Sequence, residues 1–143
     1  MPLPSHLTFE LVTPDRAIVR EQVDEVQIPG TQGYLGVLPG HTPLLTTLQV
    51  GELWFLQGGE KYFVSIAFGF AEVLPDRVTI LAQIAERAEE VDVSRAEQAQ
   101  HRARERLSKA ETDVDYARAR IALMKSLIRL QVASKVRERP RAL

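Results

Sequence analysis

The stretch VTILAQIAERAEEVDVSRAEQA, residues 78–99, contains the change in composition that decides the fold. It begins with the apolar run Val78–Leu81, which is typical of a β-strand. After Glu90 there is no glycine and no proline until Pro140, and the good helix formers Ala, Arg, Glu and Gln dominate. We therefore expect strands before this stretch and helices after it.

Upstream, the sequence has the pattern of short β-strands. Apolar residues alternate at Leu7, Phe9 and Leu11, and again at Leu53 and Phe55, which predicts strands with one buried face. Turn signals interrupt the chain too often for long helices, at Pro14-Asp15, Pro29-Gly30, Pro39-Gly40, Gly58-Gly59 and Pro75-Asp76. Short strands at this spacing favour a β-sandwich or a barrel.

Downstream, the composition predicts an antiparallel helical hairpin. Asp92 or Ser94 can cap the first helix and Thr112 the second, with a turn near residues 109–112. The first helix offers a stripe of small residues that permits close packing, namely Ala96, Ala99, Ala103 and Ala110 with Leu107. The apolar stripe expected on the second helix is Val114, Ala117, Ile121, Met124 and Ile128. The predicted fold class is thus a β-sandwich over residues 1–88 followed by an α-helical antiparallel hairpin over residues 89–143.

The hairpin is expected to be only marginally stable. Burying each large apolar side chain of the second helix would contribute about 1.5–3 kcal/mol. Ordering the backbone costs about 1–2 kcal/mol per residue before hydrogen bonds and helix propensity offset it. A folded and an opened form within a few kcal/mol of each other are therefore physically plausible.

Composition limits the class of protein. With 143 residues, 45% of them hydrophobic and 26% charged, the chain suits one ordinary domain or a small domain with an appendage. Cysteine is absent, which excludes disulfides and thiolate metal sites. No apolar run approaches the roughly 20 residues that span a bilayer, and the N-terminus lacks signal-peptide features. We expect membrane association only through partners, and the cytoplasm as the default compartment.

The two parts carry opposite charge. Up to Ala85 there are four cations and nine acids, a net charge of −5, whereas the remaining 14 cations and 10 acids give +4. The basic part could suggest a nucleic-acid partner, but its cations alternate with acids and Tyr116 is its only aromatic residue. A solvated helix face is the preferred interpretation, and no nucleic-acid partner is expected. A free-standing helical-hairpin adaptor or nucleic-acid-binding module remains the alternative function.

Sites of chemistry are not apparent in the sequence. His6, His41 and His101 lie far apart without the spacing of metal ligands, so no metal site is expected. Neither a GxSxG elbow nor a P-loop occurs, and the segment GYLG at residues 33–36 lacks the following Lys-Ser/Thr that phosphate binding requires. We therefore expect a protein without catalytic activity of its own.

The segment GYLGVLPGHTPLLTTLQVGEL, residues 33–53, resembles the epsilon subunit of bacterial F-type ATP synthases. The resemblance continues through FGFAEV at 68–73, through residues 78–99, and through DVDYARARIALMKSLIRL at 113–130. It implies a non-catalytic subunit of the rotating central stalk, without a cofactor, that helps couple proton translocation to ATP synthesis. The implied partners are the gamma subunit, the c-ring and the catalytic beta and alpha subunits, at the cytoplasmic face of the bacterial plasma membrane.

The resemblance also implies contacts with the c-ring and gamma through Gln32, Tyr34 and His41. From the residues themselves, Gly33, Gly36 and Gly40 are expected to serve turn geometry, and Leu35, Leu38 and Leu44 the sandwich core. The hairpin of this family can open and inhibit ATP hydrolysis through basic residues of the second helix. The corresponding residues here are Arg118, Arg120, Lys125, Arg129, Lys135, Arg137 and Arg139.

ATP is implied as a regulatory ligand by the segment VDVSRA, residues 91–96. Some family members bind ATP through Ile or Leu, Asp, two variable residues, Arg and Ala, so Val91 departs conservatively from the pattern. The implied contacts are Glu86, Asp92, Arg95, Ala96, Arg102, Lys125 and Arg129, with Lys125 standing where tight binders have Arg. Arg95 and Lys125 each lie 15 residues from a turn centred on Ala110, which places them abreast. In the competing interpretation, Asp92 merely caps the helix and the arginines are solvated.

Overall fold

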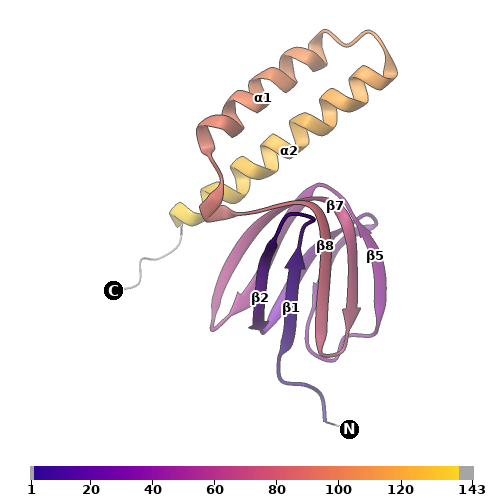
Figure 1. Cartoon of the computed structure of the whole chain (residues 1–143), viewed down its shortest axis with the longest axis vertical. Helices are drawn as coiled ribbons and strands as arrows, with labels where there is room; N and C mark the ends of the chain where they lie inside the picture. The colour runs from indigo at the N-terminus through magenta and orange to yellow at the C-terminus, as the bar shows by residue number, and fades with distance from the viewer. Residues whose placement is uncertain (1, 139–143) are drawn as a thin grey trace. The chain divides into compact units, whose positions relative to one another are not determined.

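The structure is a computed structural model, and it describes residues 2–138, with the side chains of 137 and 138 left aside. Two compact units follow each other in the chain, one up to Arg87 and one from Ala88 onward. The elements in chain order are β1 (Leu7–Val12), β2 (Ala17–Val23), β3 (Glu25–Gly30), β4 (Gly33–Val37), β5 (Leu44–Leu48), β6 (Gly51–Gln57), β7 (Glu60–Leu74), β8 (Arg77–Arg87), the 3₁₀ turn η1 (Ala88–Glu90), α1 (Val93–Ser108) and α2 (Asp113–Glu138) (Figure 1).

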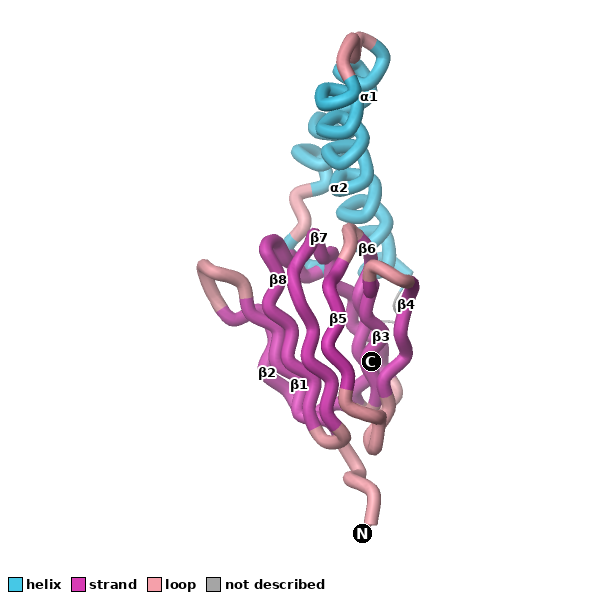
Figure 2. Tube along the Cα trace, turned by 90° about the vertical axis from the view of Figure 1, so that its right-hand side faces the viewer, coloured by secondary structure: helices cyan, strands magenta, loops and turns pink. Residues whose placement is uncertain are grey.

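The first unit is the predicted β-sandwich (Figure 2). Its longest strand, β7, pairs with β5, β6 and β8. The strands are hydrogen-bonded in the order β2-β1-β8-β7-β5-β3-β4, and β6 pairs with both β3 and β7. The first half of β7 pairs with β6 and the second half with β5, while β8 runs beside nearly its whole length. The strands pair antiparallel except β1 and β8, which run parallel. Because β4 ends the order, it forms an edge of the sheet.

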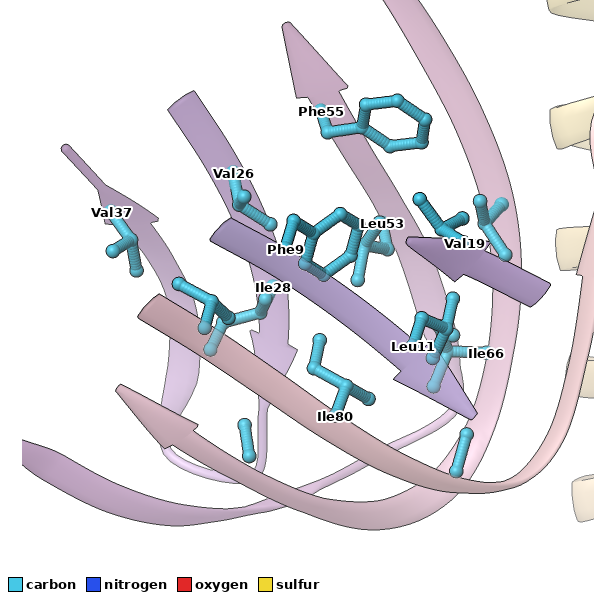
Figure 3. Packing of buried hydrophobic residues seen from close by; sticks show 14 of the residues in the cluster. Phe9, Leu11, Val19, Val26, Ile28, Val37, Leu53, Phe55, Ile66 and Ile80 are labelled. Carbon is cyan, nitrogen blue, oxygen red and sulfur yellow. The ribbon is translucent and has the colours of Figure 1, made fainter. Parts of the chain in front are cut away.

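The core contains the residues that alternation predicted. Leu7, Phe9 and Leu11 of β1 are completely buried, as is Leu53, and Phe55 is nearly so. Figure 3 shows the side chains of Phe9, Leu11, Leu53 and Phe55 directed from different strands into one shared interior. The rings of Phe9 and Phe55 lie 5.4 Å apart in a tilted arrangement, a favourable aromatic geometry.

Four of the five predicted turn signals lie between strands, but Pro29-Gly30 does not. These two residues form the end of β3, where Gly30 pairs with Gly33, and the turn itself is made by residues 31 and 32. Proline is tolerated in this strand because its carbonyl oxygen still accepts a hydrogen bond, at 3.0 Å from the backbone N–H of Gln49. The expectation of a turn at Pro29 was therefore wrong.

Two of the three leucines that were expected in the core are exposed. Leu35 packs against the core cluster, whereas Leu38 is 56% exposed and Leu44 36% exposed. Leu38 follows the end of β4 and Leu44 begins β5, so both lie at the boundary of a connecting loop rather than inside the sheet. Strand alternation places every second side chain in the core only inside a strand, not in or beside a loop. The prediction that Leu38 and Leu44 belong to the core was wrong for this reason.

The second unit is the predicted helical hairpin with the predicted caps. The side chain of Asp92 accepts a hydrogen bond from the backbone N–H of Arg95 at 3.1 Å and caps α1. The hydroxyl of Thr112 accepts a hydrogen bond from the backbone N–H of Asp115 at 3.1 Å at the start of α2. Lys109 ends α1, so the turn lies where the sequence placed it.

Small residues on both helices form the contact between them, which corrects the stripe predicted for α2. On α1, Ala96 and Ala103 are buried as expected and Ala99 and Leu107 are half-buried, as is Ala110 in the turn after the helix. On α2 the buried positions are Ala119, Ser126, Val132 and Ala133. Of the predicted stripe, Val114, Ala117, Ile121 and Met124 are exposed and Ile128 is half-buried.

The spacing of the small residues explains this choice of face. Ala96, Ala103 and Ala110 recur every seven residues, and so do Ala119, Ser126 and Ala133, which keeps each set on one side of its helix. Counted outward from the turn, Ala103 comes opposite Ala119. Two rows of small side chains allow closer approach of the helices than a row of large ones would.

Candidate docking surfaces and nucleotide site

The outer face of the sheet carries exposed apolar residues in neighbouring positions. Leu45 is 75% exposed, Phe70 63% and Leu81 54%. Phe70 of β7 stands directly opposite Leu81 of β8, and Leu81 stands opposite Val12 of β1. Contiguous apolar surface of this kind marks interaction sites on folded domains.

A hollow of about 330 Å³ opens in this outer face beside Gly69. It is lined by Val12, Thr13, Pro14, Gly69, Phe70, Leu81, Ala82 and Gln83, a set without a charged side chain. Gly69 has a φ of +136°, and a Cβ on it would lie 2.1 Å from the carbonyl oxygen of Leu81. Its neighbour Phe68 also has a positive φ, +64°, which is uncommon for a bulky residue and costs energy. Glycine is therefore required where β7 passes closest to β8.

This apolar outer face was missed by the sequence analysis, although a signal for it existed. Ile80 and Leu81 are consecutive apolar residues in a strand, so one of them must point outward. Ile80 is completely buried and Leu81 is the outward one. A break in the alternation of apolar and polar residues thus indicated a second apolar face.

The residues implied for contact with the c-ring and gamma lie along the edge strand β4. Gln32 belongs to the turn before this strand, Tyr34 lies on it, and His41 comes four residues after its last residue, Val37. A five-residue strand extends about 16 Å, so Gln32 and His41 lie at opposite ends of β4. The set is a line along one edge rather than a single loop.

Of the three, Tyr34 has a clear structural contact. Its hydroxyl accepts a hydrogen bond from the backbone N–H of Glu52 at 3.3 Å. It also covers Gly51, where a Cβ would lie 2.8 Å from the Tyr34 hydroxyl and 2.6 Å from Cβ of Pro29. Gln32 is exposed and His41 half-buried, with Nδ1 of His41 at 2.6 Å from the carbonyl oxygen of Thr42.

The residues implied for ATP contact come from both units. Glu86 lies on β8 in the first unit, and the other six lie in the hairpin. Ala96 is buried between the helices, and Arg95 and Arg102 directly precede the buried residues Ala96 and Ala103. On α2, Lys125 likewise directly precedes the buried Ser126.

These positions place several cations along one side of the hairpin. In antiparallel helices, residues that directly precede the contact positions on each helix meet on the same side. Arg95 and Arg102 are exposed there on α1, while Lys125 is half-buried on α2. Arg129, one helical turn beyond Lys125, is also half-buried. The carboxylate of Asp92 is engaged as the N-cap of α1, where it accepts a hydrogen bond from the backbone N–H of Arg95.

The basic residues of α2 do not form one continuous face. At 3.6 residues per turn, Arg118, Lys125 and Arg129 lie within about 40° of each other around the helix. Arg120 and Lys135 point in other directions, more than about 90° from Arg118. The side chain of Arg137 and the whole of Arg139 lie outside the described residues. The described stripe therefore consists of Arg118, Lys125 and Arg129.

The described residues contain neither a helix that could span a membrane nor a cluster that could hold a metal ion. No described helix has the length and apolar character needed to cross a membrane. Among the residues whose placement is described, no group of three or more His, Asp or Glu side chains gathers in a way that could hold a metal ion. The surfaces above are thus the candidates for function in the described part of the chain.

Both units match one family of proteins. Residues 6–88 match the beta-sandwich domain of the ATP synthase delta/epsilon chain, and residues 86–134 match its long alpha-helix domain. Together the two matches cover most of the chain. The chain therefore belongs to the ATP synthase delta/epsilon chain family.

Curated relatives narrow the resemblance to the epsilon chain. The ATP synthase epsilon chain of Solibacter usitatus is 49% identical over 133 residues, which cover 93% of this chain and 99% of the relative. The epsilon chain of Koribacter versatilis is 56% identical over 99 residues, covering 69% and 70% of the two chains. These relatives confirm the resemblance to the epsilon subunit that the sequence motifs indicated. They do not favour a free-standing adaptor or nucleic-acid-binding module.

A solved structure supports the same assignment. A chain from the Euglena gracilis mitochondrial ATP synthase, in a structure described as containing OSCP, F1 and the c-ring, is similar with a TM-score of 0.79 and 26% identity. The similarity covers 97% of this chain and 85% of that chain. A chain from the Tetrahymena thermophila mitochondrial ATP synthase, with a TM-score of 0.56, 13% identity and 93% and 98% coverage, shares the fold.

Proposed function

We propose that this chain is a non-catalytic subunit of the rotating central stalk of an ATP synthase, where it couples proton translocation to ATP synthesis in other subunits. The observation that carries the proposal is the apolar outer face of the sandwich, because a rotor subunit must be fixed to its neighbours. In this proposal the complex holds the chain at the cytoplasmic face of the bacterial plasma membrane.

The apolar outer face is proposed to dock on the gamma subunit. Phe70 and Leu81 are each more than half exposed, although they lie on paired strands of the sheet. Covering large apolar side chains contributes about 25 cal/mol per Å² of buried apolar area, which favours association with a partner. Co-purification of the chain with gamma tests this docking, and failure of the intact chain to bind gamma would contradict it.

The edge strand β4 is proposed to face the polar loops of the c-ring. Gln32 and His41 mark the two ends of this strand, and Gln32 makes no structural contact comparable to that of Tyr34. Because the chain contains no cysteine, single cysteines can be introduced cleanly. Gln32→Cys and His41→Cys are expected to crosslink to cysteines in the c-ring loops of the assembled enzyme. Failure across several pairs would remove this docking face.

The hairpin is proposed to inhibit ATP hydrolysis when it opens. Arg118, Lys125 and Arg129 would then meet acidic segments of the catalytic beta and alpha subunits, since complementary charge guides such contacts. Exposed ion pairs contribute only about 0.2–1 kcal/mol each, so the stripe must act together. Removal of all residues after Glu90 is expected to raise ATP hydrolysis while the complex still assembles. Unchanged hydrolysis would count against inhibition by the hairpin.

ATP is proposed to bind the folded hairpin without being hydrolysed. The cations Arg95, Arg102 and Lys125 lie on one side of the helix pair and can provide charge-assisted hydrogen bonds to phosphates. Lys125 and Arg129 belong to the inhibitory stripe as well as to this site. ATP held by the folded form would therefore withdraw the same cations from the catalytic subunits.

A further inference from the structure

An acidic residue of β7, Glu72, lies within the apolar outer face of the sandwich. Glu72 of β7 is exposed, and it pairs across the sheet with Leu45 on one side and Thr79 on the other. Phe70 lies two residues earlier on the same strand and therefore on the same face, about 7 Å away along the strand. Glu72 thus lies beside the hollow that Phe70 and Leu81 help to line.

Among the described residues Glu72 forms no ion pair, and Arg77, on the same face of β8, is paired with Glu10 instead. In the same row, Glu10 has Arg20 at 3.5 Å and Arg77 at 3.9 Å. Within residues 2–136 no cation lies within salt-bridge distance of Glu72. As long as the face is open, water solvates the carboxylate and its charge costs little.

Docking on this face changes the energetic balance for Glu72. A partner that covers Leu45 and Phe70 also removes water from the carboxylate between them. An ionised carboxylate that loses its water without gaining a partner is strongly destabilising. A surface that brings a positive charge to Glu72 is therefore favoured over one that does not.

The hollow beside Glu72 suits an apolar side chain of the partner rather than a charged one. Its lining includes Val12, Gly69, Phe70, Leu81 and Ala82. A volume of about 330 Å³ without charged lining suits a large apolar side chain. A partner that left the hollow empty would forgo this burial at the centre of the contact.

We propose that the gamma subunit is recognised here by two neighbouring groups, a large apolar side chain seated in the hollow beside Gly69 and a Lys or Arg paired with Glu72. This inference rests on the proposed docking to gamma and specifies its chemistry. The apolar side chain supplies affinity, and the ion pair fixes the orientation of the two surfaces. Together they distinguish gamma from any apolar surface that lacks the cation.

The test measures the dissociation constant between the full-length chain and the gamma subunit of the same enzyme. Glu72→Lys is expected to weaken binding at least about tenfold, because it places like charges together in a desolvated contact. Phe70→Ala is expected to weaken binding about tenfold by removing a wall of the hollow. Asp76→Lys makes the same charge change in the exposed β7–β8 turn and is expected to leave binding unchanged. Circular dichroism melting of each variant checks that the sandwich remains folded.

A photoreactive benzoylphenylalanine at position 70 identifies the facing residues. The crosslinked gamma peptide is expected to contain a Lys or Arg close to a large apolar residue. If intact chain and gamma bind but either Glu72→Lys or Phe70→Ala binds as tightly as the unmodified chain, the two-part recognition is overturned while docking stands. If the intact chain does not bind gamma at all, the proposed docking itself fails.

Discussion

At the scale of single residues, two glycines of the sandwich are expected to respond differently to substitution by alanine. A Cβ at Gly51 would lie 2.6 Å from Cβ of Pro29 and 2.8 Å from the hydroxyl of Tyr34, whereas at Gly36 the nearest atom, in Glu25, is 4.0 Å away. Gly51→Ala is therefore expected to lower the free energy of unfolding by about 1–3 kcal/mol through overpacking. Gly36→Ala should change it little. Urea unfolding of the two variants measures the difference, and equal stability would contradict the role assigned to Tyr34 as a cover over Gly51.

The residue pattern predicted which side chains form the core, but it did not predict the contact between Tyr34 and Gly51. Alternation at Leu7, Phe9 and Leu11 predicted burial correctly because every second residue of a strand faces one side. The contact of Tyr34 with Gly51 was not predictable, since it joins residues 17 positions apart across β3, β4 and β6. Local pattern carries no information about such long-range neighbours.

At the scale of elements, the hairpin offers a matched pair of alanines on opposite faces of α2. Ala119 is completely buried against α1, and Ala117 is exposed. Ala119→Leu is expected to force the helices apart and destabilise the hairpin by about 1–3 kcal/mol. Ala117→Leu should have little effect on the hairpin. Thermal melting followed by the helical circular dichroism signal distinguishes the two variants. Because Ala119→Leu favours the open hairpin, the proposed inhibition also predicts that this variant inhibits ATP hydrolysis more strongly than the unmodified chain.

Equal melting of the Ala119 and Ala117 variants would show that the seven-residue rows do not hold the hairpin together. The stripe predicted for α2 was wrong because helical spacing alone does not distinguish two possible apolar stripes on the same helix. Val114 and Ile121 are larger than Ala119 and Ser126, yet the small residues match the small stripe of α1 in spacing and size. The caps Asp92 and Thr112 were predictable because capping depends on residues only three apart.

At the scale of the whole molecule, the sequence indicated two units of opposite charge, and the structure divides the chain at Arg87. What the sequence could not provide was the outward face of the sandwich, because Phe70 and Leu81 become neighbours only through the pairing of β7 and β8. The two units therefore suit different tasks. The sandwich presents apolar docking surface, and the hairpin presents charge that is available or withheld according to its conformation.

This division predicts that ATP stabilises the hairpin of the isolated protein. A ligand that binds only the folded form raises its stability by RT ln(1 + [L]/Kd), or about 2.7 kcal/mol at one hundred times Kd. Titration with ATP, followed by NMR, is expected to give saturable shifts at residues of α1 and α2 such as Ala96 and Ala103. Arg95→Ala should abolish these shifts because it removes a phosphate ligand, while Arg104→Ala, which removes an exposed cation of α1 two residues beyond Arg102, should retain them. No saturable binding at millimolar ATP, or the same binding by both variants, would leave Asp92 as a helix cap and the arginines as solvated charges.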